Sequence, residues 1–99
     1  MSYRVLTDYR AGMPRTPKDA KPYRLIACHW TAGGAGYNGA IGTIGYMVST
    51  ASQRNASYHE LWAYDESSDL FSVIRIVPVS HCAHSLNPQQ PPGPYTPDA

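Results

Sequence analysis

Four histidines and two cysteines are the side chains of this sequence best suited to bind a metal or to act as nucleophiles: Cys28, His29, His59, His81, Cys82 and His84. A neutral imidazole nitrogen and a thiolate are both common zinc ligands. His29 stands near the end of the apolar stretch 24–30 (RLIACHW), shortly before a glycine-rich segment. In open α/β sheets, ligands bind beyond the carboxyl ends of the strands. His29 is therefore either a ligand at the edge of a crevice or a core histidine that hydrogen-bonds to a backbone carbonyl.

Tyr58 and His59 are neighbours in the aromatic stretch 57–64 (SYHELWAY), whose loose alternation is typical of a strand. Neighbouring side chains of a strand point to opposite faces, so only one of the two can share a cleft with His29. Tyr58 in that place would offer a phenol to a developing oxyanion, and His59 would offer a second metal ligand. Alternatively, both residues only pack across strands.

The segment His81-Cys82-Ala83-His84 superficially resembles a metal-binding cluster. Zinc ligands usually stand two or more residues apart, and neighbouring side chains diverge on extended backbone. We therefore do not expect a zinc site built from this segment alone. Cys82 stays a nucleophile in principle, although nothing in the sequence indicates a lowered thiol pKa.

The first third of the chain predicts an arm, a strand and a loop. Residues 1–22 contain Pro14, Pro17 and Pro22, and proline is excluded from helix interiors and central strands, so we expect an irregular N-terminal arm. The near-continuous apolar residues of 24–30 predict a central strand buried on both faces. Five glycines in residues 31–42 predict a loop that leads into a helix.

Residues 43–54 have the period of an α-helix. Ile44, Met47, Val48 and Ala51 recur at positions i, i+3, i+4 and i+7, which places them on one helix face. Thr43 is a suitable N-cap. We predict a helix over 43–54 that buries this face.

The second half of the chain predicts a β-hairpin followed by irregular segments. Residues 57–64 are rich in aromatic side chains and residues 70–77 in β-branched ones, and DESSD at 65–69 is typical of a turn. A short histidine-bearing segment follows at 79–85, and the proline-rich residues 86–99 predict a loop. The β-α-β-β order predicts an α/β fold with a mixed central sheet flanked by helices.

Length and charge limit the functions open to the chain. Its 99 residues allow one domain, and a net charge of +1 provides no basic field, so we expect neither nucleic acid nor membrane as a partner. No apolar run approaches the ~20 residues of a membrane span, and the N-terminus has no signal-peptide core. In a cytoplasm the two cysteines are expected as free thiols, while one bridge between them stays open.

The order of these motifs resembles that of the zinc-dependent N-acetylmuramoyl-L-alanine amidases, a family that includes phage endolysin amidases and peptidoglycan recognition proteins. The resemblance rests on a strand ending in H-W-T-A-G-G, a helix, S-Y-H at a strand start, a hairpin, and then V-P-V-S-H-C-A-H. It covers residues 22–86, and H-x-T-A-G-G is its most specific element. It implies an amidase-like α/β fold.

The resemblance implies roles for four residues. His29 matches the first zinc ligand of the family. Thr31 matches a threonine at the wall of the cleft, where it would contact substrate. Tyr58 matches the catalytic tyrosine near the scissile carbonyl, and His84 matches a histidine that lines the substrate groove.

The implied reaction is hydrolysis of the amide bond between N-acetylmuramic acid and L-alanine in bacterial peptidoglycan. Zinc would be the cofactor, because it polarises the carbonyl and lowers the pKa of its bound water to about 7. The resemblance further implies a monomeric bacteriophage enzyme that stays in the host cytoplasm until lysis and then reaches the cell wall.

The sequence departs from the family in its metal ligands. The family carries its second zinc histidine, and a cysteine or aspartate ligand, well beyond the A-H element, and no counterpart is present up to Ala99. His59 and His81 match no catalytic residue. Because catalytic zinc usually has three protein ligands, we expect residues 23–99 to be the N-terminal portion of an amidase domain, inactive alone.

Two other functions stay open. A non-catalytic peptidoglycan-binding module of the same fold would keep a groove with Trp30, Tyr58, Trp62 and His84 but no metal. A small structural phage protein would use its histidines only for packing.

Overall fold

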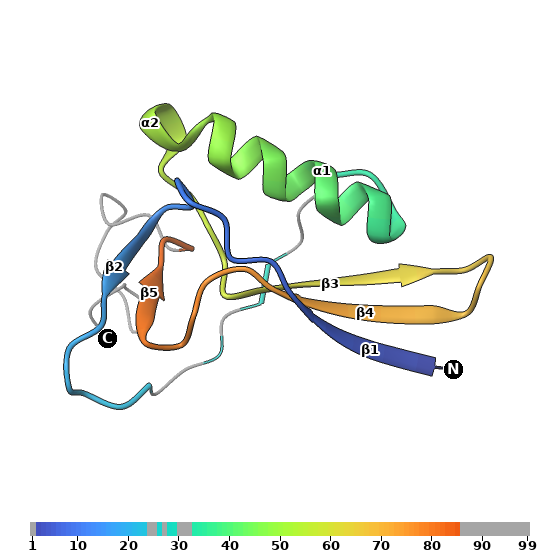
Figure 1. Cartoon of the computed structure of the whole chain (residues 1–99), viewed down its shortest axis with the longest axis horizontal. Coiled ribbons are helices and arrows are strands. Elements are labelled where there is room, and N and C mark those ends of the chain that lie inside the picture. Colours follow the sequence, from blue (N-terminus) through green and yellow to red (C-terminus); the bar gives the residue numbers. More distant parts are fainter. Residues whose placement is uncertain (1, 24–25, 27, 30–32, 86–99) are drawn as a thin grey trace.

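The structure is a computed structural model that describes residues 2–23, 26, 28–29 and 33–85. Figure 1 shows a helix lying over one face of a three-stranded sheet, with two short paired strands toward the other end of the molecule. Within the described residues, no helix is both long and apolar enough to cross a lipid bilayer. The elements in chain order are β1 (Ser2–Thr7), β2 (Arg15–Pro17), α1 (Gly36–Ser49), α2 (Ala51–Arg54), β3 (Glu60–Asp65), β4 (Leu70–Arg75) and β5 (His81–Ala83).

The three-stranded sheet is mixed and has the order β1-β4-β3. β4 pairs in parallel with β1 and antiparallel with β3, so that both Val5 and Trp62 lie opposite Val73. β2 and β5 form a separate antiparallel pair. The prediction of an α/β class with a mixed sheet is confirmed at this level.

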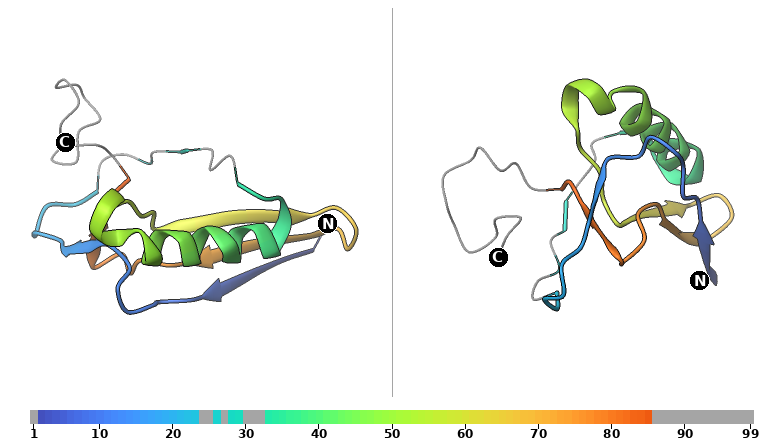
Figure 2. Two further views of the ribbon diagram at one scale, coloured as in Figure 1. Left: turned by 90° about the horizontal axis from the view of Figure 1, so that it is seen from above. Right: turned by 60° about the vertical axis from the view of Figure 1, so that its left-hand side comes forward.

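The core lies between α1 and the inner face of the sheet. On β3, Leu61 and Ala63 are buried, whereas Trp62 and Tyr64 are exposed on the outer face, as the period of a strand requires. No described helix covers that outer face in the views of Figures 1 and 2. The buried apolar cluster consists of Met13, Ala40, Ile44, Met47, Leu61, Ala63, Ile74, Ile76 and Val77.

The predicted helix is confirmed, but its predicted bounds are wrong. α1 ends at Ser49, a separate α2 covers Ala51–Arg54, and Ala51 is not part of the buried core. Ile44 and Met47 are buried and Val48 packs against the core, as the apolar period indicates. The helix begins at Gly36, within the segment predicted as a loop. Thr43 is therefore not an N-cap: it lies inside α1, and its Oγ1 donates a hydrogen bond to the carbonyl of Gly39, at 3.0 Å.

Contacts outside the helix explain why a glycine-rich segment is helical. Both carboxylate oxygens of Asp65 on β3 accept from the backbone N–H of Tyr37, each at 3.2 Å, and so cap the start of α1. Gly36 has a φ of 71°, and a Cβ there would collide with that carboxylate. A Cβ on Gly39 would collide with the backbone of Gly34. These contacts and the apolar face outweigh the low helix propensity of glycine.

The prediction of an irregular N-terminal arm over residues 1–22 is wrong, because β1 and β2 both lie in that range. Arg4 on β1 donates from Nε to Ser72 Oγ on β4 at 2.9 Å, and Met13 is part of the buried core. Pro17 is compatible with β2 because this strand has a partner on one side only.

The prediction of a buried strand over 24–30 is wrong for the residues that can be compared. Ile26, Cys28 and His29 are exposed, Ile26 to 92%, and belong to no strand. β1 and β3 occupy the positions on either side of β4 that a further central strand would take. Residues 24, 25, 27 and 30, and the loop predicted over 86–99, lie outside the described residues.

The predicted hairpin is confirmed as the antiparallel pair β3 and β4. Its turn is closed by Tyr64, whose hydroxyl donates to Asp69 Oδ1 at 2.6 Å, while Asp69 has a left-handed φ of 50°. This hydrogen bond, and to a lesser degree desolvation, raises the pKa of the Tyr64 phenol. β3 begins at Glu60, so Tyr58 precedes the strand.

Candidate functional site

His29 and Tyr58, predicted as a metal ligand and a catalytic tyrosine, lie next to each other. Their ring centroids are 5.4 Å apart and their planes meet at 45°. His29 is exposed, whereas the Tyr58 ring is half-buried against the core. Among the residues the structure describes, the Tyr58 hydroxyl has no hydrogen-bond partner. An imidazole and a phenol thus lie side by side.

His59 contacts Tyr23 and His81 rather than His29. This decides which residue of the Tyr58–His59 pair lies next to His29. Its ring meets the edge of the Tyr23 ring, and its Nε2 lies 2.8 Å from the carbonyl oxygen of His81. Because a carbonyl only accepts, this contact assigns the hydrogen of the imidazole to Nε2. The residue of the pair that neighbours His29 is therefore Tyr58.

Both cysteines are free thiols, Cys28 exposed and Cys82 half-buried. Cys82 lies in β5, close to the phenol of Tyr23. Burial raises the pKa of this phenol, and the charge interaction with Cys82 raises it further. Cys28 precedes His29 in the chain. No hydrogen bond or ring contact among the described residues joins either thiol to the His29–Tyr58 pair, so no cysteine nucleophile is assigned to this site.

His84 is held in place by polar groups from two other elements. Its Nε2 lies 2.6 Å from Thr16 Oγ1 on β2, and its Nδ1 lies 2.9 Å from Asn55 Oδ1. Asn55 ends α2 with a left-handed φ of 49°, the conformation of a helix C-cap. Since both ring nitrogens are bonded within the protein, His84 offers its ring, and not a free nitrogen, to a ligand.

Ser57 connects His84 to the segment that carries Tyr58. Its hydroxyl is fully buried, donates to the carbonyl of Pro14 at 2.5 Å and accepts from the backbone N–H of His84 at 2.9 Å. Its own backbone N–H donates to the carbonyl of His84 at 3.1 Å. His84 is therefore fixed beside the residue that precedes Tyr58 in the chain.

Replacing Ser57 by alanine is expected to lower the free energy of unfolding by about 1–3 kcal/mol. The substitution leaves the buried carbonyl of Pro14 and the amide of His84 without this partner. Urea unfolding of the variant measures the loss, with Ser67→Ala in the exposed hairpin turn as the control, expected to stay within about 0.5 kcal/mol of the parent. Equal stability of the two variants would show that the hydroxyl does not connect these segments.

The remaining predicted groove residues are placed only in part. Thr31 and Trp30 lie outside the described residues. Trp62 is 66% exposed on the outer face of β3. It lines, with Tyr64 and residues 33–36, a hollow of about 370 Å³ at the start of α1.

The described residues do not by themselves complete the zinc centre that the resemblance implies. They contain no group of three or more His, Cys, Asp or Glu side chains placed to hold one metal ion. A catalytic zinc site usually has three protein ligands and one open position. His29 alone does not make such a site, so any further ligands would have to lie outside the described residues.

Sequence reasoning missed the residues that position His84. Asn55 follows a helical pattern, and asparagine is a frequent left-handed cap, so a signal for it was present. Thr16 lies in the segment that the prolines predicted as irregular. No local pattern marks Ser57, because its partners Pro14 and His84 are distant in the sequence.

Comparisons of this chain with protein-family models, with curated proteins and with solved structures found no match.

Proposed function

We propose that this protein is a peptidoglycan amidase of the phage endolysin kind, which cleaves the bond between N-acetylmuramic acid and L-alanine. The observation that carries the proposal is the contact between the rings of His29 and Tyr58, with centroids 5.4 Å apart. The motif resemblance assigns these two residues to one catalytic centre, although they are distant in the sequence. The fold that surrounds them has the α/β class and mixed sheet that the proposal requires.

Tyr58 has the freedom that its proposed role needs. Its hydroxyl has no partner among the described residues, while its ring is held against the core. It would donate a hydrogen bond to the substrate carbonyl oxygen as negative charge develops there. His84, fixed beside the same segment, would line the groove next to the stem peptide.

Zinc enters this proposal as the cofactor to be tested. His29 would supply one ligand, and further ligands would have to lie outside the described residues. Metal analysis of the purified protein therefore decides this part of the proposal separately from activity.

A second candidate function is peptidoglycan binding without cleavage. The exposed Trp62 beside the hollow at the start of α1 would then provide the contact surface.

The test uses insoluble bacterial peptidoglycan and the protein expressed from its intact gene. An amidase releases stem peptides and creates new α-amino groups on L-alanine, and we expect this release to stop when zinc is removed and to return when it is restored. Co-sedimentation with peptidoglycan without new amino groups would support the binding module. Neither release nor co-sedimentation would overturn both proposals.

A further inference from the structure

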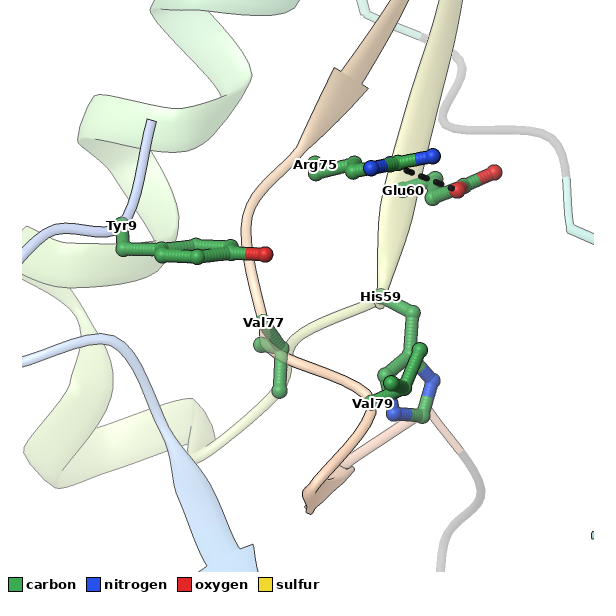
Figure 3. A pocket seen from close by; sticks show the side chains of 6 residues that line it. All are labelled: Tyr9, His59, Glu60, Arg75, Val77 and Val79. Carbon is green, nitrogen blue, oxygen red and sulfur yellow. Dashed lines mark ion pairs between the residues drawn. The ribbon is translucent and has the colours of Figure 1, made fainter. Parts of the chain in front are cut away.

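A small cavity lies on the side of the molecule that His59 faces, apart from the His29–Tyr58 pair. It has a volume of about 230 Å³ and opens where β3 begins and β4 ends. Figure 3 shows the side chains that line it: Tyr9, His59, Glu60, Arg75, Val77 and Val79. The amidase reaction proposed above uses none of them.

Two opposite charges lie together at this cavity. Arg75 Nε is 3.8 Å from Glu60 Oε2, and the two side chains are 54% and 38% exposed. Such an exposed pair contributes little to stability. Trp62 Nε1 also donates to Glu60 Oε1 at 3.1 Å, which holds the carboxylate in position.

The hydrogen-bonding capacity of this pair is only partly used. Among the described residues, the terminal guanidinium nitrogens of Arg75 have no partner, and neither does the hydroxyl of Tyr9. A guanidinium fork matches the two oxygens of a carboxylate. The Glu60 carboxylate keeps lone pairs for a further donor. In Figure 3 the Tyr9 ring points its hydroxyl toward the space between Arg75 and Val77.

The rest of the lining sets the size and polarity of a ligand. Val77 and Val79 form an apolar wall opposite the charged pair. A volume of about 230 Å³ is below the range of about 300–1,000 Å³ found for drug-sized ligands. The cavity therefore suits a molecule of few atoms with a short apolar group.

We propose that this cavity binds a small zwitterion, namely an α-amino acid with a short side chain. Its carboxylate would bind the free guanidinium N–H groups of Arg75 and the hydroxyl of Tyr9. Its ammonium would donate to Glu60, and its side chain would contact the exposed Val79 beside Val77. Because Arg75 and Glu60 together carry no net charge, a ligand with one charge of each sign complements them, whereas a simple anion or cation leaves one group facing a like charge.

The test compares three matched molecules by NMR titration of the full chain: alanine, propionate, which lacks the ammonium, and ethylamine, which lacks the carboxylate. We expect saturable shifts at Arg75 and Val77 with alanine in the millimolar range, and binding weaker by about tenfold or more for the two single-charge analogues. Equal binding of propionate and alanine, or no saturable shift at these residues, would overturn the proposal.

Variants test the residues named. Arg75→Gln and Glu60→Gln are each expected to weaken alanine binding by about tenfold or more, because each removes one charged partner. Arg15→Gln on β2 and Glu66→Gln in the hairpin turn are the charge-matched controls and should bind alanine like the parent. If a strand variant does not fold, Tyr9→Phe and the ligand comparison on the parent still decide the question. Unchanged binding by folded Arg75→Gln would also overturn the proposal.

Discussion

Replacing His29 by alanine is expected to abolish the release of stem peptides from peptidoglycan by the protein made from its intact gene. The proposed function makes His29 a metal ligand, and an imidazole ligand has no substitute in alanine. The thermal stability should change little, because His29 is exposed and lies outside every strand. Amino-group release and thermal unfolding, measured on the same preparation, separate the two effects.

A milder substitution tests Tyr58, the second residue of the His29–Tyr58 pair. Tyr58→Phe keeps the ring that packs near His29 and removes only the hydroxyl, so kcat is expected to fall by about 10²–10³-fold while the fold is kept. Tyr46→Phe, on the exposed side of α1, is the matched control and should keep full activity. Full lytic activity of His29→Ala, with a loss of stability only, would instead favour a packing role for the histidine.

Replacing Ile74 by alanine is expected to lower the free energy of unfolding by about 2–5 kcal/mol. Ile74 lies on the central strand β4, is 1% exposed, and pairs in register with Leu6 on one side and Leu61 on the other. A small domain has about 5–15 kcal/mol of stability in total, so this one cavity removes a large share of it. Urea unfolding followed by circular dichroism measures the change.

Ile26→Ala provides a control with the same change of side chain. Ile26 is 92% exposed, so its truncation creates no cavity and should alter stability by about 0.5 kcal/mol or less. Comparing the two variants also tests the prediction that residues 24–30 form a buried strand. A loss at Ile26 as large as that at Ile74 would mean that residues 24–30 form a buried strand after all.

The elements that were predicted correctly are those whose pattern is local. The spacing of Ile44 and Met47 predicts the buried face of α1, and the aromatic and β-branched residues around DESSD predict the β3–β4 hairpin. In both cases neighbours in the sequence are also neighbours in the structure. The mixed α/β class follows from these elements.

The elements that were missed depend on distant contacts. β1 is mostly exposed and has no clear apolar alternation, and only its parallel pairing with β4 makes it a strand. The start of α1 depends on Asp65, which caps the helix from β3. Conversely, the apolar character of residues 24–30 predicts burial, although Ile26 is exposed. An apolar composition favours burial in a sheet. Here β1 and β3 already pair with both sides of β4.

The candidate site was predictable only as a set of residue types. The resemblance assigns His29, Tyr58 and His84 to one centre, and the structure places His29 beside Tyr58 and His84 beside Ser57. The contacts of His84 with Thr16 and Asn55 join segments that no motif connects. The cavity at Glu60 and Arg75 arises from strand register, because these residues face each other across β3 and β4.

The pairing of the first strands with the last ones has a consequence for synthesis on the ribosome. β1 and β2 leave the ribosome before their partners β4 and β5, and the Arg4–Ser72 hydrogen bond spans 68 residues. A nascent chain that has reached α1 therefore has no sheet on which to pack the apolar face of this helix. Contacts of such long sequence separation slow folding. Both strand pairs should therefore form only after β5 has emerged. Until then β1 and β2 are unpaired strands that can aggregate.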